Sequence, residues 1–301
     1  MESKPVWTIM KILNWTKQYF ARKGVENPRL DAEILLCAVL DCERINLYVD
    51  FERPLSEEEL ARFRGYVLRR GAQEPLAYIL GEKGFMRNSF KVTQDTLVPR
   101  PETELLVENI IKLAESVGGD VKILDIGTGS GAIIVSLLDY LPQAKGVGVD
   151  ISVGALTVAR ENAQNIGVLD RCGFIRSDVF SKVPLEKKFD IIVSNPPYIP
   201  AGDIAGLAPD VQQEPHGALD GGVDGLDFYR RITAEAADHL AEDGLLAFEI
   251  GYDQGEAVAA LCRAAGFSRT IVLKDYAELD RMVLGAKEDG KYADLLLEIA
   301  K

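Results

Sequence analysis

Four residues that follow a predicted β-strand, Asn-Pro-Pro-Tyr at 195–198, have the types and spacing to bind an amino group. The preceding FDIIVS, residues 189–194, is typical of a short buried strand, but two prolines cannot continue the central strand of a sheet. The Asn195 side-chain oxygen and the Pro196 carbonyl can each accept a hydrogen bond from one NH₂ group, and the Tyr198 ring offers a flat face to a planar group. The motif therefore indicates a site for a planar NH₂ group, with a purely structural Pro-Pro turn as the alternative.

A conjugated NH₂ group is a poor nucleophile because its lone pair is delocalised. Two acceptors that hold both N–H bonds can orient the nitrogen toward an electrophilic carbon and favour the charge that develops during attack. No general base is required before transfer, since the proton can leave afterwards. This chemistry fits methylation of an amide or aryl amino group.

A glycine-rich loop, DIGTGSG, follows another predicted strand and places Gly127, Gly129 and Gly131 directly before a helix. Such a loop lets a ligand approach the backbone, whose free amides can meet a carboxylate or phosphate, although a structural turn is possible too. Asp150 ends the next strand, where an acid can bind the two hydroxyls of a ribose. Together the loop and the acid indicate a nucleoside cofactor.

NAD and S-adenosylmethionine are the two main candidates for this cofactor. A dinucleotide fingerprint has the spacing G-x-G-x-x-G, whereas this loop has G-x-G-x-G, which favours the methyl donor. Asp178, after the third strand, would suit the exocyclic amine of adenine, and a helix cap or turn is the alternative for this residue.

The elements that must position these residues alternate between strand and helix from about residue 99 to the end. This alternation predicts an α/β fold with a parallel, doubly wound sheet, closed by two further strands. Asn195 would then follow the fourth strand, beside the point where the strand order reverses and open sheets bind ligands.

Residues 1 to about 80 are expected to be helical. Apolar residues at helical spacing run from Val6 to Lys23, Pro28 can open a helix through about Leu40, and Ser56 with Glu59 matches a capping box for a helix that ends near Gly71. Residues 81–98 change to glycines, aromatics and β-formers, which predicts a hairpin or an extended connector.

The composition restricts the function. A chain of 301 residues with 47% hydrophobic residues can bury a large core, and its net charge of −13 disfavours nucleic-acid binding, which relies on Lys and Arg. The four cysteines show no CxxC spacing, so we expect reduced thiols and no metal site. No apolar run is long enough for a membrane span and the N-terminus is not typical of a signal peptide, so a cytoplasmic protein is expected.

Nearly the whole chain resembles the PrmC/HemK protein-(glutamine-N5) methyltransferases. The resemblance rests on the motifs PRPETE at 99–104, ILDIGTGSGAI, NPPY and EPHGALDGG at 214–222, of which NPPY alone marks only amino-group methylation. It implies a Rossmann-like class I S-adenosylmethionine-dependent methyltransferase domain over 99–301, a β-hairpin or linker over 81–98 and a small helical substrate-binding domain over 1–80.

The resemblance also implies a function and the residues that perform it. The substrate would be the glutamine of the Gly-Gly-Gln motif in class-1 peptide chain release factors, methylated on its side-chain nitrogen. The catalytic residues implied are Asn195, Pro196 and Tyr198, and the substrate-binding residues are Asn195, Pro196, Pro197 and Tyr198. The cofactor-binding residues implied are Gly127, Thr128, Gly129, Ser130, Gly131, Asp150, Asp178, Val179 and Asn195. The PRPETE segment, Pro99 to Glu104, should lie near the cofactor.

Two features depart from the family pattern. Some relatives carry an aromatic residue at the position of Val179, so either Val179 or Phe180 could contact adenine. The tail, residues 287–301, extends past the usual closing strand, and the sequence leaves its role open, together with the oligomeric state and the contacts with the release factor.

The closest rival function is a DNA or RNA amino-methyltransferase acting on adenine N6, cytosine N4 or guanine N2. Such an enzyme needs a target-recognition region rich in base and phosphate contacts, and none is visible between Gly131 and Asn195. A non-catalytic adaptor on a methyltransferase fold would predict a broken loop or motif, and both are intact. We therefore expect a protein substrate, with no membrane association and no direct nucleic-acid binding.

Overall fold

The structure, a computed structural model, describes residues 6–118 and 120–299. The chain forms two compact units, one of Met1–Gly81 with Ala208–Gln213 and the other of Glu82–Leu207 with Glu214–Lys301. Residues 1–5, on which part of the expected cytoplasmic location rests, lie outside the described residues, as do the last two residues of the tail.

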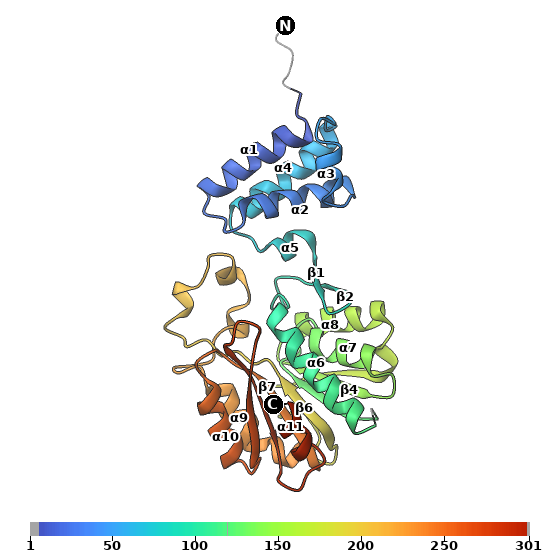
Figure 1. Ribbon diagram of the computed structural model, residues 1–301, viewed down its shortest axis with the longest axis vertical. Coiled ribbons are helices and arrows are strands. Elements are labelled where there is room, and N and C mark those ends of the chain that lie inside the picture. The colour runs from blue at the N-terminus through green and yellow to red at the C-terminus, as the bar shows by residue number, and fades with distance from the viewer. Residues whose placement is uncertain (1–5, 119, 300–301) are drawn as a thin grey trace. The chain divides into compact units, whose positions relative to one another are not determined.

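The first unit is a helical bundle. Its helices are α1 (Ile9–Arg22), α2 (Pro28–Leu40), α3 (Asn46–Val49), α4 (Glu57–Gly71) and α5 (Leu76–Leu80). Figure 1 shows α1, α2 and α4 lying side by side, and their apolar faces share one core that includes Phe20, Leu35, Leu36 and Phe63. Arg70, almost fully buried, pairs with Asp31 at 2.7 Å and with Asp210 at 3.2 Å, so the segment Ala208–Gln213 is fastened to the bundle.

Local capping signals account for the helix starts in this unit. The predicted capping box is confirmed: the Glu59 amide donates to Ser56 Oγ at 3.1 Å, and the Ser56 amide donates to the Glu59 carboxylate at 2.8 Å. The first helix begins at Ile9, three residues after the predicted start at Val6, because Thr8 caps it with a hydroxyl that accepts from the Lys11 amide.

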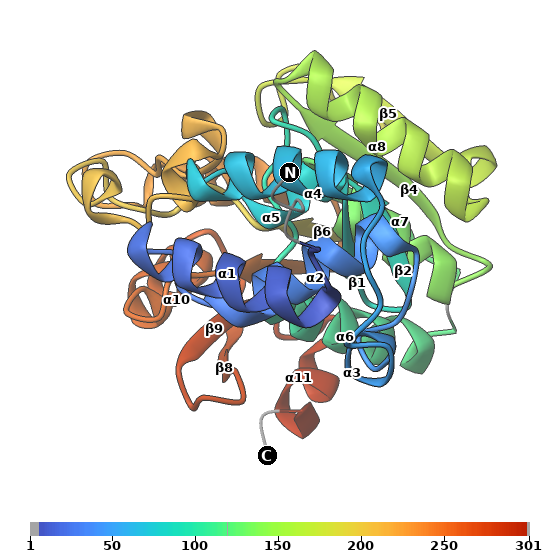
Figure 2. The same ribbon diagram turned by 90° about the horizontal axis from the view of Figure 1, so that it is seen from above.

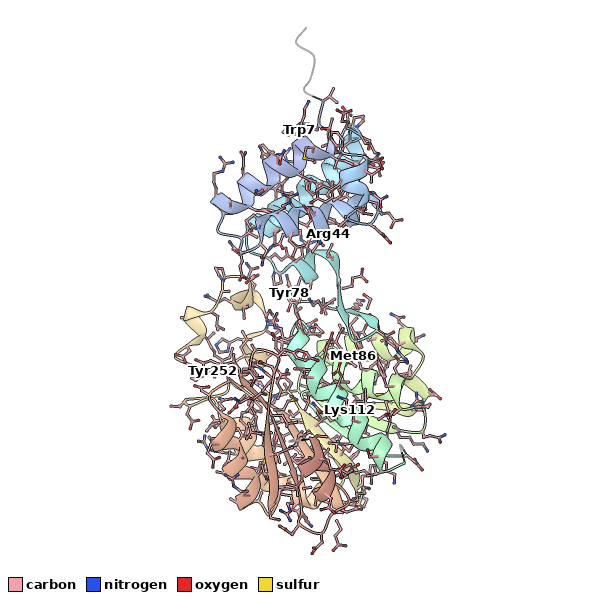
Figure 3. All side chains as sticks on the ribbon, viewed as in Figure 1. Trp7, Arg44, Tyr78, Met86, Lys112 and Tyr252 are labelled. Atoms are coloured by element: carbon pink, nitrogen blue, oxygen red, sulfur yellow. The ribbon has the colours of Figure 1, made fainter. Side chains whose placement is uncertain are left out.

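The second unit begins with a two-stranded hairpin, β1 (Glu82–Phe85) and β2 (Asn88–Lys91). Met86, in the turn, has a φ of 53°, and Figure 3 shows it beside α6. Phe85 and Phe90 are buried and meet edge to face, with ring centroids 5.9 Å apart. These rings join the core of the second unit, so the hairpin is packed against this unit.

A seven-stranded sheet forms the centre of the second unit. Its strands are β3 (Lys122–Ile126), β4 (Lys145–Asp150), β5 (Cys172–Arg176), β6 (Phe189–Ser194), β7 (Leu240–Glu249), β8 (Arg269–Lys274) and β9 (Asp280–Ala286). They lie in the order β5-β4-β3-β6-β7-β9-β8. The predicted parallel pairing is confirmed for β3 to β7. Strand β9 is antiparallel to both of its neighbours, β7 and β8, and the short link from β8 requires this orientation for the β8–β9 pair.

Helices cover both faces of this sheet, as predicted for a doubly wound fold (Figure 1). One face packs against α6 (Pro101–Ser116), α7 (Ala132–Tyr140), α8 (Val153–Ile166) and α11 (Ala293–Ile299). The other face packs against α9 (Asp227–His239) and α10 (Gly255–Ala264). Figure 2 shows α8 running beside β4 and β5 at one edge of the sheet. Within the described part of the chain, no helix is both long and apolar enough to cross a membrane.

The strand order places the reversal point between β3 and β6. After β3 the chain builds outward through β4 and β5, and it then returns to add β6 on the opposite side of β3. The carboxyl ends of neighbouring strands on the two sides of a reversal leave a crevice that loops do not cross. The glycine loop after β3 and Asn195 after β6 therefore border the same crevice.

The tail packs as part of the second unit. Tyr292 and Leu296 are completely buried in the core cluster that also holds Leu245 and Leu284 of the sheet. The Tyr292 hydroxyl has no hydrogen-bond partner among the described residues, so this side chain contributes mainly its ring. The tail thus extends the hydrophobic core over the last strands of the sheet.

We predict that Leu296→Ala lowers the free energy of unfolding by about 2–5 kcal/mol, because it removes a fully buried side chain from the core. Tyr292→Phe should change this free energy by less than about 1 kcal/mol, because the hydroxyl it removes has no partner. Urea denaturation followed by circular dichroism measures both. An unchanged midpoint for Leu296→Ala would show that α11 does not pack in solution.

Candidate active site

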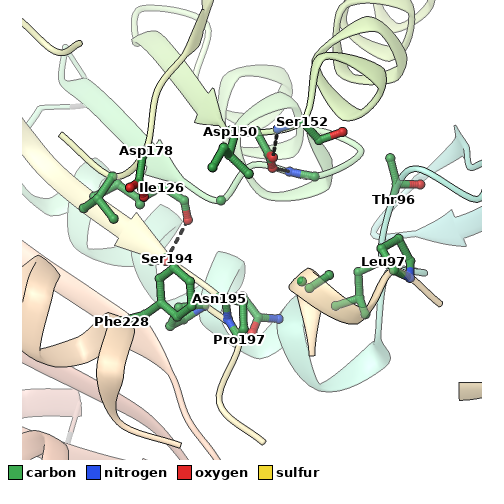
Figure 4. A pocket seen from close by; sticks show the side chains of 18 of the residues that line it. Thr96, Leu97, Ile126, Asp150, Ser152, Asp178, Ser194, Asn195, Pro197 and Phe228 are labelled. Atoms are coloured by element: carbon green, nitrogen blue, oxygen red, sulfur yellow. Dashed lines mark hydrogen bonds between the residues drawn. The ribbon is translucent and has the colours of Figure 1, made fainter. Parts of the chain in front are cut away.

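A cavity of about 300 Å³ opens at the carboxyl ends of β3, β4 and β6. Its walls come from the glycine loop, the ends of β4 and β6, the segment Gln94–Leu97 and the start of α9 (Figure 4). This volume is within the range of small-molecule sites, and the position at the strand reversal is the one expected for a ligand in this fold.

The glycine loop presents its backbone to the cavity. Gly127 and Gly129 line the wall, and Gly129 has a φ of 55°, a conformation that favours glycine. Thr128 and Ser130 are buried and do not line the cavity. Gly131 lies behind the loop, where an added Cβ would come within 3.1 Å of the Ala159 Cβ. Two of the five loop residues implied for cofactor binding therefore face the cavity, and the other three shape the turn.

A buried acid holds this loop from below. The Asp125 carboxylate accepts from Thr128 Oγ1 at 2.6 Å, and complete burial raises the pKa of Asp125 to about 7. The hydrogen bond favours the charged form and thus opposes the effect of burial. Asp125 therefore fixes the loop and does not line the cavity.

Asp150 presents a carboxylate whose orientation is fixed by two backbone amides. Its Oδ2 accepts from the Gly129 amide at 3.0 Å and its Oδ1 accepts from the Ser152 amide at 2.9 Å (Figure 4). A carboxylate oxygen has two lone pairs, so each oxygen retains one for a further donor. Asp150 is therefore arranged to accept hydrogen bonds from two adjacent hydroxyl groups.

Of the two candidate adenine contacts after β5, Val179 and Phe180, Val179 is the one that faces the cavity. Val179 lines the cavity, whereas the Phe180 ring stacks on His239 with centroids 4.4 Å apart. Val179 has a φ of 49°, which strains a β-branched residue, and its carbonyl accepts from Ser177 Oγ at 2.7 Å. A strained backbone held by a local hydrogen bond thus aims Val179 into the cavity and Phe180 away from it.

Phe228 is a cavity residue that sequence reasoning missed. It lies in the first turn of α9 and lines the wall near Asp178 and Asn195 (Figure 4). Arg231, one turn further along α9, donates to the Asp178 carboxylate at 2.7 Å and lies 5.5 Å from the Phe228 ring centre. The signal was an aromatic residue at a helix start in GLDFYR, which the sequence alone could not place near the glycine loop.

The Asn-Pro-Pro-Tyr segment leaves the sheet at the cavity wall. Asn195, Pro196 and Pro197 line the cavity. Tyr198 is not among the lining residues, and its ring packs against the core of the second unit. Burial raises the pKa of Tyr198 to about 12, so this phenol is neutral at physiological pH. The motif therefore turns two prolines and an amide toward the cavity and anchors itself through the aromatic ring.

The glycines of the segment LDGGVDG explain how Tyr198 is held. A Cβ at Gly225 would lie 2.3 Å from the Tyr198 carbonyl oxygen, and one at Gly221 would lie 2.8 Å from the Tyr198 Cα. The Gln254 side chain donates to the same Tyr198 carbonyl at 2.9 Å. Only glycine permits this close backbone approach, which fixes the path of the chain beyond the prolines.

Two of the segments quoted from sequence, PRPETE and EPHGALDGG, meet through Glu214. Its buried carboxylate accepts from the Val98 amide at 2.9 Å and pairs with the Arg100 guanidinium at 2.5 Å. Pro215 and Gly217, which follow it, line the cavity. The EPHGALDGG segment thus forms part of the wall and PRPETE holds it from behind, although Glu214 follows Arg100 by 114 residues in the chain.

The PRPETE segment itself lies behind the cavity wall. The resemblance implied that PRPETE lies near the cofactor. The residues that line the cavity at this side are Gln94–Leu97, which come just before it in the chain. Two of its side chains connect it to other parts of the unit. Asn195 Nδ2 donates to Thr103 Oγ1 at 3.2 Å, and the Glu104 carboxylate accepts from the Met86 amide at 2.8 Å.

The described residues contain neither a group of potential metal ligands nor a disulfide bond. In residues 6–118 and 120–299, no three His, Cys, Asp or Glu side chains are grouped so that they could hold a metal ion. All four cysteines are free thiols, and Cys172 and Cys262 are buried.

Two family models match the chain: the PrmC N-terminal domain over residues 11–81 and the methyltransferase small domain over residues 101–208. The release factor glutamine methyltransferase of Geobacter sulfurreducens is 45% identical over 95% of this chain and 99% of its own length. That of Moorella thermoacetica is 44% identical over 94% of this chain and 99% of its own length.

A solved structure with a related description is also similar. The protein-(glutamine-N5) methyltransferase (release factor-specific) from Alicyclobacillus acidocaldarius is 30% identical, covers 66% of this chain and 99% of its own, and has a TM-score of 0.40. Because curated relatives match 93–95% of this chain at more than 40% identity, this chain belongs to the family of release factor glutamine methyltransferases.

Proposed function

We propose that this protein transfers a methyl group from S-adenosylmethionine to the side-chain amide nitrogen of the glutamine in the Gly-Gly-Gln motif of class-1 peptide chain release factors. The observation that carries the proposal is the position of Asn195, whose amide lies on the cavity wall with its nitrogen bonded to Thr103. Its oxygen is then left to accept from a substrate NH₂ group. The names of the relatives supply the substrate class.

S-adenosylmethionine fits the residues around the cavity. Asp150 has one lone pair on each oxygen for the two ribose hydroxyls, and the backbone of Gly127 and Gly129 on the cavity wall would border the methionine portion. Asp178 and Val179 would border the adenine, and Phe228 adds an aromatic face there. When bound, this cofactor supplies a methyl group on a sulfonium sulfur, which keeps the bonding electron pair as the new N–CH₃ bond forms.

The chain's own residues act by positioning. The Asn195 side-chain oxygen and the Pro196 carbonyl accept the two N–H bonds of the substrate amide and turn its nitrogen toward the methyl carbon. The same two acceptors favour the positive charge that develops on the nitrogen, and one proton then passes to water. Pro197 keeps the turn rigid, and Tyr198 supports it from the core of the unit as a neutral ring.

The remaining parts of the proposal concern organisation and partners. We propose residues 1–80 as the substrate-binding domain, 81–98 as a hairpin linker and 99–301 as the methyltransferase domain. The release factor is the macromolecular partner, and the net charge of −13 argues against direct nucleic-acid binding. The four free thiols suit the reducing cytoplasm.

For the cofactor, we expect calorimetry to detect S-adenosylmethionine and its demethylated product at one site and no binding of NAD. Asp150→Ala should weaken binding by about 1.5–3 kcal/mol, the contribution of hydrogen bonds to a charged group. Asp170→Ala is the matched control, since Asp170 is an exposed acid that does not line the cavity. Equal affinities for wild type and Asp150→Ala would remove this acid from the site.

For catalysis, we expect Asn195→Ala to lower kcat on the intact release factor by about 10²-fold or more, because it removes an acceptor aligned with the reacting nitrogen. At least some affinity for S-adenosylmethionine, measured by calorimetry, should remain, although the resemblance also places Asn195 among the cofactor-binding residues. A variant that kept most of its turnover would show that another group binds the substrate amide.

For the substrate, mass spectrometry of a release factor after incubation should show one added methyl group on the glutamine of Gly-Gly-Gln. The gain should be absent in a Gln→Ala factor, and a short Gly-Gly-Gln peptide should be a much poorer substrate, because it lacks the rest of the large partner. Label from the cofactor appearing on RNA or DNA, with the release factor unlabelled, would instead support an amino-methyltransferase of nucleic acids.

A further inference from the structure

Asn195 is the first member of a buried chain of hydrogen bonds. Its Nδ2 donates to Thr103 Oγ1 at 3.2 Å, and Thr103 Oγ1 donates to the Glu249 carboxylate at 2.5 Å. Thr103 is 4% exposed and Glu249 is 1% exposed. The three residues come from different elements, the turn after β6, the first turn of α6 and the end of β7. Water therefore has little access to Thr103 and Glu249, whose polar atoms must be satisfied within the chain.

The donor and acceptor capacities of the three groups fix the direction of the chain. An ionised carboxylate only accepts hydrogen bonds, so the single Thr103 proton must point to Glu249. The Thr103 oxygen can then only accept, and it requires the NH₂ end of the Asn195 amide. The Asn195 oxygen must consequently point the other way, toward the cavity that this residue lines.

We propose that Glu249, acting through Thr103, is a positioning residue that sets which end of the Asn195 amide faces the substrate. The proposal rests on the proposed function, because that function needs the Asn195 oxygen as an acceptor for the substrate NH₂ group. A reversed amide would present its own N–H groups to those of the substrate, and two donors cannot bond to each other.

The charge on Glu249 determines the direction of the hydrogen bonds between Asn195, Thr103 and Glu249. A protonated Glu249 can donate to Thr103, which frees the Thr103 proton to donate to the Asn195 oxygen and makes the reversed amide equally acceptable. Only the ionised form enforces the productive orientation. Turnover should therefore fall as the pH is lowered through the pKa of Glu249.

The surroundings of Glu249 place this pKa in an accessible range. Complete burial raises the pKa of Glu249 to about 7, against the hydrogen bond from Thr103, the charge of Arg281 on β9 and a direct hydrogen bond from the Asn195 side chain, which lower it. This direct contact turns the NH₂ end of Asn195 toward Glu249 as well. Glu102 on α6 raises it, and the phenols of Tyr198 and Tyr229 face the same region. The Tyr229 hydroxyl donates to the Glu249 backbone carbonyl at 2.9 Å, so the end of β7 is held in place.

The test compares methylation of an intact release factor by wild type, Thr103→Val, Thr103→Ser and Glu249→Gln between pH 6 and 9. Thr103→Val should lower kcat by about 10²-fold, the effect of misplacing an aligned group, while Thr103→Ser, which keeps the hydroxyl, restores most of it. Glu249→Gln should lower kcat at pH 8 and abolish the acidic fall in kcat near pH 7. Thr157→Val on α8 is the control, because its hydroxyl donates to the Val153 carbonyl of the same helix and Thr157 does not line the cavity.

A second readout reports on Asn195 directly. In wild type labelled with ¹⁵N-asparagine, the side-chain NH₂ signals of Asn195, identified by their loss in Asn195→Ala, should shift between pH 6 and 8, and in Glu249→Gln they should not. Calorimetry with S-adenosylmethionine verifies that each variant is folded.

A wild type that leaves the release factor unmethylated would overturn the proposed function. A wild type that methylates it while Thr103→Val and Glu249→Gln keep full kcat, or an acidic limb that survives in Glu249→Gln, would overturn only the inference about Glu249.

Discussion

The active end of this protein depends on the register in which its central strands pair. Ile126 lies opposite both Val149 of β4 and Ser194 of β6, and Ser194 lies opposite Phe248 of β7. The next residue on each strand is therefore Gly127, Asp150, Asn195 and Glu249, which form one row across the carboxyl edge of the sheet. A one-residue shift in the pairing of any of these strands would turn the side chains of that strand to the opposite face of the sheet. The cofactor residues, the substrate amide site and the buried acid are thus aligned by backbone hydrogen bonds.

Buried carboxylates then attach the loops to this row. Asp125 holds the glycine loop through Thr128, Glu214 holds the chain at Val98 and Arg100, and Glu249 holds Thr103. Burying an acid is costly unless donors surround it, so each acid requires its loop to stay in one position. The consequence is a cavity whose wall is prearranged, and positioning catalysis of the proposed kind requires such rigidity.

The PRPETE segment has a role that its composition did not reveal. Arg100, Thr103 and Glu104 bind Glu214, Glu249 and the Met86 amide, three partners from three separate parts of the unit. The segment connects the hairpin, the loop after the prolines and the last parallel strand. Its residues support the site from behind, and the cavity surface at this side is supplied by Gln94–Leu97.

The sequence by itself determined the features that depend on neighbouring residues. These features are the capping box of Ser56 and Glu59, the alternation of strands and helices, and the glycine turn before α7. Each involves groups within a few residues of one another, so its pattern can be recognised in the sequence. Only the tertiary structure decided that Val179 faces the cavity, that Phe228 joins it and that Thr103 meets Glu249, 146 residues away. These contacts follow from strand order and packing, which no local pattern encodes, because a buried hydrogen bond depends on where the whole sheet brings its two partners together.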